Sequence, residues 1–158
     1  MSVSSVKEYL KNFNKDSKVM EFEVSSATVE LAAKAVGTEP ARIAKSLTFW
    51  IGESPIMIVC AGDVKIDNSK FKATFSTKAK MIGFDEVESV IGHAVGGVCP
   101  FAINDGVKVY LDESLKRFDK IYPACGSSNS AIGLTPNELS EICQNFNGFV
   151  DVCKPIES

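Results

Sequence analysis

The chain has 158 residues, of which 45% are hydrophobic and 23% are charged, and its formal net charge is −3. These values predict one globular domain over residues 1–158, and they argue against a disordered chain or a strongly basic, general nucleic-acid binder. No apolar run approaches the roughly 20 residues that span a bilayer, and residues 1–7 contain no apolar signal segment, so we expect a cytoplasmic protein without a membrane segment.

Helices and strands are predicted to alternate in the first part of the chain. In order, we expect a helix over 4–13, a strand over 19–24, a helix over 28–36 and a helical turn over 39–43. Ser26 or Thr28 can cap the second helix, and Gly37 can end it. The small alanines of this helix predict close packing on a sheet.

A β-hairpin is predicted next. Residues 45–51 alternate in the manner of a strand, and Gly52 to Pro55 form a turn. Residues 56–61 are a continuous apolar run, which is typical of a strand buried on both faces. We therefore expect 56–61 at the centre of its sheet.

The remaining predicted elements are short. They are a basic helix over 69–75, an extended piece at 81–82, a capped helix start at 85–88 that ends at Gly92, a strand over 107–111, a helical turn over 113–116 capped by Asp112, a strand over 120–124 and a shorter strand over 131–134. The last helix begins at Thr135, which can form a capping box with Glu138 and precedes Pro136. Because strands outnumber helices and alternate with them irregularly, the sequence predicts an α+β (mixed α/β) fold around a strongly curved sheet.

The histidine and cysteine counts restrict the chemistry. His93 is the only histidine, which excludes a zinc centre with two imidazoles and an HExxH protease. The five cysteines include no CxxC pair and no two closer than ten residues, which argues against a disulfide framework or a zinc ribbon. We therefore expect reduced thiols, no metal site and no cofactor.

The most unusual segment runs from Gly92 to Phe101. Two adjacent glycines, Gly96 and Gly97, are followed three residues later by Pro100. Glycine allows the backbone to turn its N–H groups outward, so such a loop can present amide donors to an anion or a carbonyl. The segment is neither a GxGxxG nor a Walker loop. The plain alternative is a turn that ends a helix.

Four further features are candidates, each with a structural alternative. The segment Cys125–Ser130 is rich in small polar residues and is either part of a site or a polar turn between strands. Lys45 begins an apolar strand and places its ammonium either in a cleft or in solvent. His93 is a possible general base without an evident partner in the sequence, and Cys99 is a possible nucleophile without supporting charges nearby.

Residues 64–84 form a local basic segment on an acidic chain. Against Asp67 alone they carry five lysines, Lys65, Lys70, Lys72, Lys78 and Lys80. The segment is either a solvated helix face or a patch that contacts a phosphate backbone.

Several of these segments together resemble a known family. Residues 32–47 resemble the pattern A-x-x-L-G-x-x-P-x-x-I-x-K-T-L, and Gly96 to Phe101 resembles a Gly-x-x-x-Pro loop followed by Phe. Residues 107–112 resemble a V-x-V-x-x-D strand, and Ala124 to Gly126 a small-residue strand end. Over about residues 27–142 the chain is similar to the YbaK/ProX family of aminoacyl-tRNA editing domains, which in turn resemble the insertion domain of bacterial prolyl-tRNA synthetases.

The resemblance implies a metal-free deacylase with a partly open, barrel-like mixed sheet and flanking helices. Its substrate would be a mischarged tRNA, typically Ala or Cys on proline tRNA, and its partner possibly a prolyl-tRNA synthetase. Lys45 would contact the terminal adenosine or the ester. The remaining implied site residues are the loop backbone that positions the carbonyl and ribose (Gly96, Gly97, Val98, Cys99, Pro100) and the substrate-binding residues (His93, Phe101, Gly126, Ser127, Ser128).

The chain also departs from the family pattern. Ser46 replaces the usual Thr after the lysine, and Ile91-Gly92-His93 stands where many relatives have Thr-Gly-Tyr. These changes bear on amino-acid specificity and on how the tRNA end is held. Two other functions stay open, which are a non-catalytic binding module of the same fold and a thiol-dependent protein that uses Cys99.

Overall fold

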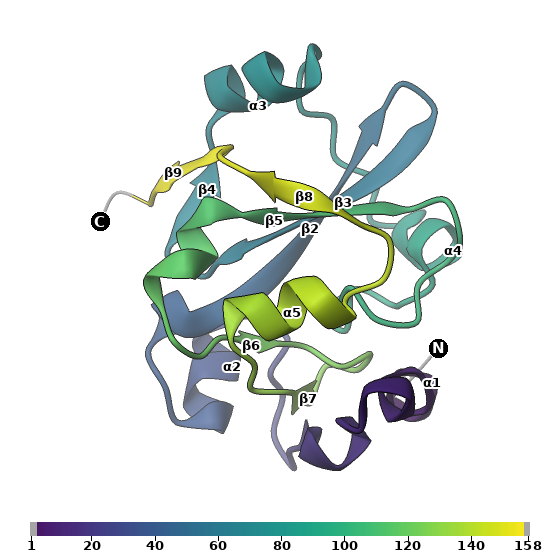
Figure 1. Cartoon of the computed structure of the whole chain (residues 1–158), viewed down its shortest axis with the longest axis vertical. Helices are drawn as coiled ribbons and strands as arrows, with labels where there is room; N and C mark the ends of the chain where they lie inside the picture. Colours follow the sequence, from purple (N-terminus) through teal and green to yellow (C-terminus); the bar gives the residue numbers. More distant parts are fainter. Residues whose placement is uncertain (1–2, 157–158) are drawn as a thin grey trace.

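The structure is a computed structural model that describes residues 3–156, and a mixed five-stranded sheet forms its centre (Figure 1). The strands are β1 (Met20–Glu21), β2 (Ile43–Ile51), β3 (Ser54–Ala61), β4 (Val64–Ile66), β5 (Lys108–Asp112), β6 (Tyr122–Pro123), β7 (Ser130–Ala131), β8 (Phe146–Val150) and β9 (Cys153–Pro155). The α-helices are α1 (Val3–Leu10), α2 (Val29–Val36), α3 (Asn68–Phe75), α4 (Val87–Ile91) and α5 (Pro136–Ile142). Short 3₁₀ turns are η1 (Lys11–Phe13), η2 (Asp16–Lys18), η3 (Pro40–Arg42) and η4 (Glu113–Arg117).

The central sheet has the order β6-β2-β3-β5-β8. β2 and β3 form an antiparallel hairpin, whereas β6 pairs with β2, β5 with β3 and β8 with β5 in parallel. Two small antiparallel sheets, β1 with β7 and β4 with β9, are added to it. The predicted α+β class is thus confirmed, and the predicted hairpin is present.

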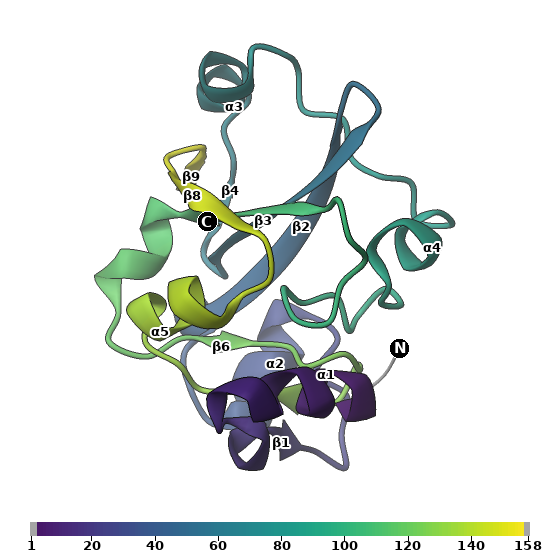
Figure 2. The ribbon, with the colours of Figure 1, turned by 45° about the vertical axis from the view of Figure 1, so that its right-hand side comes forward.

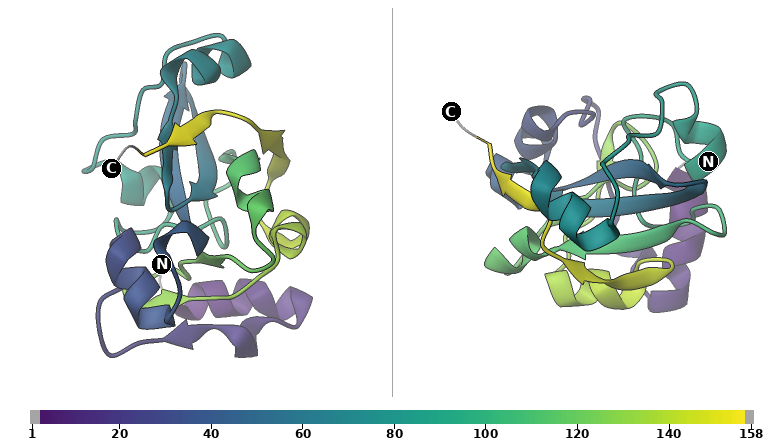
Figure 3. Two further views of the ribbon diagram at one scale, coloured as in Figure 1. Left: turned by 90° about the vertical axis from the view of Figure 1, so that its left-hand side faces the viewer. Right: turned by 90° about the horizontal axis from the view of Figure 1, so that it is seen from above.

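Helices lie at both ends of the curled sheet. Helix α3 lies at the same end of the molecule as the turn of the β2–β3 hairpin, while α1 and α2 lie at the opposite end (Figure 2 and Figure 3, left). The central strand β3 is buried from Ile56 to Ala61, as its apolar sequence predicts. None of the helices within residues 3–156 is long and apolar enough to cross a bilayer.

Aromatic rings connect α3 to the sheet. The ring of Phe71 lies 5.2 Å from that of Phe49 and 4.8 Å from that of Phe75, which in turn lies 5.1 Å from Tyr110. Phe71 and Phe49 are buried, so the basic helix predicted here is anchored by its apolar side. Of its lysines, Lys72 is exposed and Lys70 is half-buried.

The predicted helix ends are mostly confirmed. Thr28 caps α2 by accepting a bond from the Leu31 amide at 3.2 Å, and Gly37 ends it at a φ of +86°. Thr135 and Glu138 form the capping box of α5, with bonds of 3.0 and 2.8 Å. Asp112 accepts from the Ser114 amide and caps η4.

Some predicted boundaries are wrong. The strand predicted over 19–24 is only two residues long, because Phe22 and Ser26 bond instead to the backbone of residues 128–129. The predicted cap at 85–88 is absent, since α4 begins after Glu86, whose side chain makes no cap bond. The strands predicted over 120–124 and 131–134 each shrink to two residues, with a separate bridge between Ile121 and Leu134.

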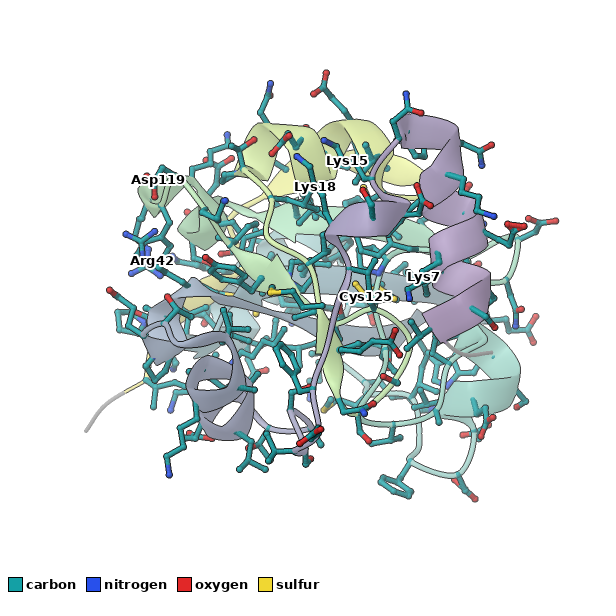
Figure 4. The ribbon with its side chains drawn as sticks, turned by 90° about the horizontal axis from the view of Figure 1, so that it is seen from below. Lys7, Lys15, Lys18, Arg42, Asp119 and Cys125 are labelled. Carbon is teal, nitrogen blue, oxygen red and sulfur yellow. The ribbon has the colours of Figure 1, made fainter. Side chains whose placement is uncertain are left out.

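An ion pair fixes the start of β2 beside β6. Arg42, in η3, donates to Asp119 at 2.8 Å and to the Lys120 carbonyl at 3.3 Å, and its guanidinium lies 5.0 Å from the ring of Phe118 (Figure 4). Residues 118–120 lead directly into β6. This cluster therefore holds β6 against the first residues of β2, at the border of the site described next.

Candidate functional site

The outer edge of β2 has different neighbours at its two ends. Ile43 and Ala44 pair with β6, whereas Phe49 pairs with Met81. Between these two pairings, no described strand pairs with residues 45–47 on this edge. The sheet is thus open at the point where the sequence predicts a functional lysine.

The main chain of Ser46 faces this opening. The Ile82 amide donates to the Thr48 carbonyl at 3.1 Å, and the Trp50 amide donates to the Lys80 carbonyl at 2.8 Å. Backbone groups of alternate residues in an antiparallel strand point to the same side. The N–H and C=O of Ser46 therefore point outward in register with those of Thr48 and Trp50.

A pocket with a volume of about 430 Å³ occupies this opening. Its lining comes from five stretches of chain that are far apart in sequence, within residues 26–32, 43–48, 81–87, 95–98 and 122–131. Small side chains such as Ala44 and Ala131 leave room in its centre. This volume suits a small molecule or the end of a larger one.

Lys45 lines the pocket, and a hydrogen bond to the neighbouring strand β4 holds its ammonium at the side of the pocket. The amino group donates a hydrogen bond to the backbone carbonyl of Val64, which is not among the lining residues. Lys45 is half-buried. The structure thus places the predicted lysine at the pocket with its charge anchored on the adjoining strand β4.

Two serine hydroxyls of the pocket lining are buried without a hydrogen-bond partner among residues 3–156. They are the Oγ atoms of Ser26 and Ser46. A buried hydroxyl that makes no hydrogen bond costs about 1–3 kcal/mol. A ligand with a polar group at this wall would remove that cost.

The glycine loop contributes its first part to the pocket. Gly96, at a φ of +96°, and Val98 line the pocket. The Gly97 amide donates to the Ala94 carbonyl at 3.0 Å, so this amide is already used within the loop. The resemblance implies that the backbone from Gly96 to Pro100 positions the substrate, and within this loop the N–H of Gly97 is not free to do so.

The two loops singled out in the sequence pack on each other. The Gly126 amide donates to the Gly97 carbonyl at 3.1 Å. A Cβ atom at position 97 would lie 2.6 Å from the Ser127 backbone nitrogen, which explains the second glycine. Gly126, Ser127 and Ser128 lie outside the pocket lining, although Ser130 is part of it.

The polar loop instead holds the N-terminal wall of the pocket. Ser127 Oγ donates within the loop, 2.9 Å from Ser130 Oγ and 2.8 Å from Asn129 Oδ1. The Ser128 carbonyl accepts a bond of 2.6 Å from the Ser26 amide. The loop thereby positions Ser26, a residue that the sequence indicated only as a helix cap.

His93, Cys99 and Phe101 are fully buried and do not line the pocket. His93 Nε2 lies 2.7 Å from the Phe101 carbonyl, which only accepts, so Nε2 carries the proton and donates. Cys99 Sγ lies 3.6 Å from the same nitrogen, a contact that the sequence did not indicate. Burial raises the pKa of Cys99 to about 12 and lowers that of His93. This arrangement argues against a thiolate nucleophile at Cys99.

The five lysines of the basic segment extend from β4 through α3 to the edge of the pocket. Lys65 lies on β4, Lys70 and Lys72 on α3, and Lys78 and Lys80 in the segment that leads to Met81. Lys70 is engaged with Asp151 and with the Cys153 carbonyl, both at 3.0 Å. No cluster of three or more His, Cys, Asp or Glu residues suited to a metal ion occurs in the described part of the chain.

Comparisons with known proteins show the family of the chain. A sequence model of the family described as aminoacyl-tRNA editing domain matches residues 23–142. The uncharacterized protein YwhH of Bacillus subtilis (strain 168) is 52% identical over 159 residues, which cover 99% of this chain and 100% of that protein. The proline–tRNA ligase of Aquifex aeolicus (strain VF5) is 28% identical over 90 residues, which cover 56% of this chain but only 16% of the ligase.

The fold is also found among solved structures. A crystal structure described as "a putative trans-editing enzyme for prolyl tRNA synthetase" superimposes with a TM-score of 0.84 at 28% identity, and the match covers 96% of each chain. The predicted curled mixed sheet with flanking helices is therefore confirmed by a relative as well as by the structure itself.

Proposed function

The chain belongs to the aminoacyl-tRNA editing domain family, and from that premise we propose that it is an aminoacyl-tRNA deacylase. It would hydrolyse the ester of a mischarged tRNA in trans, with Ala- or Cys-tRNA(Pro) as the proposed substrate. All five cysteines are free, which supports a reducing compartment, and we place the reaction in the cytoplasm.

The observation that carries this proposal is the pocket at the open edge of β2. Lys45, the outward main chain of Ser46 and the Gly96 loop meet there, in a volume of about 430 Å³. Such a pocket can admit the aminoacyl group and the terminal ribose while the rest of the tRNA stays outside. The family-like lysine and glycine loop are thus on the same pocket, although they are 51 residues apart in sequence.

The proposed reaction needs little chemical assistance, because an ester is already activated. Water attacks the ester carbonyl, the bond to the ribose oxygen breaks, that oxygen takes up a proton, and the products are a free amino acid and tRNA with its terminal hydroxyls restored. If the neighbouring ribose hydroxyl attacks first, the acyl group only moves to that oxygen, and water then releases it in the same way. The outward N–H of Ser46 is positioned to stabilise the negative charge that develops on the carbonyl oxygen. Lys45 also lines the pocket, and its ammonium is bonded to the Val64 carbonyl on the adjoining strand β4.

Discrimination among amino acids would follow from pocket shape. Small residues such as Ala32, Ala44 and Ala124 line the wall, and a size difference of one methylene contributes about 1–3 kcal/mol to selection. The buried hydroxyls of Ser26 and Ser46 would add a preference for substrates that can hydrogen-bond there.

The acceptor end of the tRNA would approach along the basic segment. Lys80 directly precedes Met81 on the pocket wall, and Lys72 and Lys78 of the same segment are exposed. A prolyl-tRNA synthetase is the proposed partner that supplies the charged tRNA. Similarity to a proline–tRNA ligase and to a structure described as a trans-editing enzyme supports this pairing.

The test is a deacylation panel with Ala-, Cys-, Ser- and Thr-charged tRNAs. Wild type should release one or more of these amino acids faster than spontaneous hydrolysis. Lys45→Ala should slow release about 10- to 150-fold, as expected for the loss of a charged hydrogen-bonding group. Lys108→Ala, an exposed lysine of β5, serves as the control and should leave the rate unchanged.

Two outcomes would overturn the proposed function. Wild type that releases none of the four amino acids above the spontaneous rate is not a deacylase of these substrates. If that protein still binds a non-hydrolysable aminoacyl analogue, it is the binding module that the sequence left open.

A further inference from the structure

The mouth of the pocket carries large apolar side chains exposed to solvent. Phe84 lines the pocket and is 80% exposed, the highest value among the large hydrophobic residues of the described chain. Met81 and Val95, also in the lining, are 59% and 46% exposed. An exposed apolar rim around a pocket is typical of a binding surface.

The ring of Phe84 is not part of the aromatic packing of the protein. Phe71 and Phe75 stack on other rings, but no aromatic ring or cation in residues 3–156 stacks on Phe84. Because the side chain is also 80% exposed, the ring is available to a planar ligand group. Nucleobases stack on such rings, whatever their sequence.

The charges next to Phe84 indicate which part of a nucleic acid can approach it. Asp85 and Glu86 follow it directly and are exposed. These carboxylates repel phosphate groups but leave a neutral base unaffected. A base, rather than the phosphate backbone, is therefore the favoured contact at this rim.

The polar groups of the pocket lie on a more buried wall. The unpartnered hydroxyls of Ser26 and Ser46 are inaccessible to solvent, whereas Phe84 is at the surface. A matching ligand has polar groups at one end and a flat base at the other. The aminoacyl-adenosine end of a charged tRNA has this order, with the amino acid and ribose first and adenine next.

We propose that Phe84 is a positioning residue that stacks on the terminal adenine of the charged tRNA and holds the aminoacyl ester in the pocket. This inference rests on the proposed deacylase function and adds a contact to it. Met81 and Val95 complete the apolar rim on which the base lies.

The test uses a stable probe, 3′-alanylamino-3′-deoxyadenosine, in which an amide replaces the ester, and the same compound without the base. Binding of both is measured by calorimetry to wild type, Phe84→Ala, Phe84→Leu and Phe84→Trp. Phe146→Ala, an exposed Phe on the opposite edge strand β8, is the matched control. Thermal melting verifies that each variant is folded.

Phe84→Ala should weaken binding of the adenosine probe about 5- to 140-fold, which corresponds to about 1–3 kcal/mol for one stacked base. Phe84→Trp should bind at least as well as wild type, and Phe84→Leu should be intermediate. Binding of the base-free probe should be the same for all variants. With charged tRNA, Phe84→Ala should raise KM and leave kcat unchanged, a split that a structural role does not produce.

Each other outcome contradicts the inference. If Phe84→Ala weakens the binding of both probes equally, or weakens the binding of neither, Phe84 does not stack on the base. If wild type deacylates tRNA while Phe84→Ala behaves like wild type, only this inference fails. A wild type that neither binds the adenosine probe nor deacylates tRNA overturns the proposed function together with the inference.

Discussion

The amide of Gly126 donates a hydrogen bond of 3.1 Å to the carbonyl of Gly97, and this bond joins the two loops behind the pocket. The backbones approach so closely that a Cβ at position 97 would lie 2.6 Å from the Ser127 nitrogen and 2.7 Å from the Gly126 carbonyl carbon. Glycine is therefore required at position 97 because there is no space for a Cβ between the two loops, and not because of its backbone angles.

Gly97→Ala should displace the loops, destabilise the protein by about 1–3 kcal/mol and lower deacylation together. The matched control is Gly106→Ala, because Gly106 has a φ of +89° but no atom within 4 Å of a Cβ. The control should lose about 1–2 kcal/mol of stability through its backbone conformation alone and keep its activity. Urea unfolding and deacylation rates distinguish the two. Equal activity in both variants would show that the contact of the loops does not shape the pocket.

The stability of the protein should fall at mildly acidic pH because of His93. Burial lowers the pKa of this side chain below its ordinary value of 6.5, so the unfolded chain binds a proton in a range where the folded protein does not. The free energy of unfolding should therefore be highest above about pH 6.5 and decrease as the pH falls below it.

Urea unfolding between pH 5 and 8 measures this dependence. In His93→Gln, whose side-chain amide can still donate to the Phe101 carbonyl, the slope between pH 5 and 6.5 should become flatter. An unchanged slope in this variant would assign the pH dependence to other groups.

Cys99→Ala should keep full deacylase activity. Its thiol is fully buried, has a pKa raised to about 12 by burial, and shares the Phe101 carbonyl with His93. Activity and its inhibition by iodoacetamide should be the same in the variant and in wild type. A large loss of activity in folded Cys99→Ala would restore the thiol-dependent function that the sequence left open.

Lys78 and Lys80 should contribute charge contacts to tRNA. Their joint replacement by alanine should weaken binding of uncharged tRNA and reduce the dependence of binding on salt by about one to two units of log K against log[salt]. Lys18→Ala with Lys108→Ala provides a control of equal charge, since both lysines are exposed on other elements. Identical salt slopes in the two double variants would refute a role for the basic segment.

Elements whose ends depend on neighbouring side chains were predictable from the sequence. Thr28 and Gly37 delimit α2, and Thr135 begins α5, because caps and left-handed glycines act within one helical turn. The long apolar run of β3 likewise predicts its central place. In each case the signal and the structure lie within a few residues of each other.

Strands β4, β8 and β9 were not predicted, and the physical reason is their dependence on distant partners. β4 and β9 are three residues long and exist only as a pair. β8 includes Gly148 at a φ of +123° and joins β5 with a register shift, so it has no clear alternation. Whether such a segment forms a strand is decided by the strand with which it pairs, and not by its own sequence.

The site shows the same division. Lys45 and Gly96 were predicted and do lie on one pocket, whereas the places of Ser26, Met81 and Phe84 were not predicted. Their positions depend on bonds between segments far apart in the sequence, such as Met81 with Phe49 of β2 and Ser26 with Ser128, and no local pattern encodes these pairings.

The separation of β6 from the Met81 segment along one edge of β2 has a consequence for the evolution of relatives. Insertions or deletions in the exposed residues 84–86 or 128–129 would move one side of the opening and leave β2, β3 and β5 paired as before. The cavity can thus be enlarged or narrowed for a different amino acid without a new core, because surface connections tolerate changes in length. One fold could in this way give rise to editing domains that differ in the amino acid they accept.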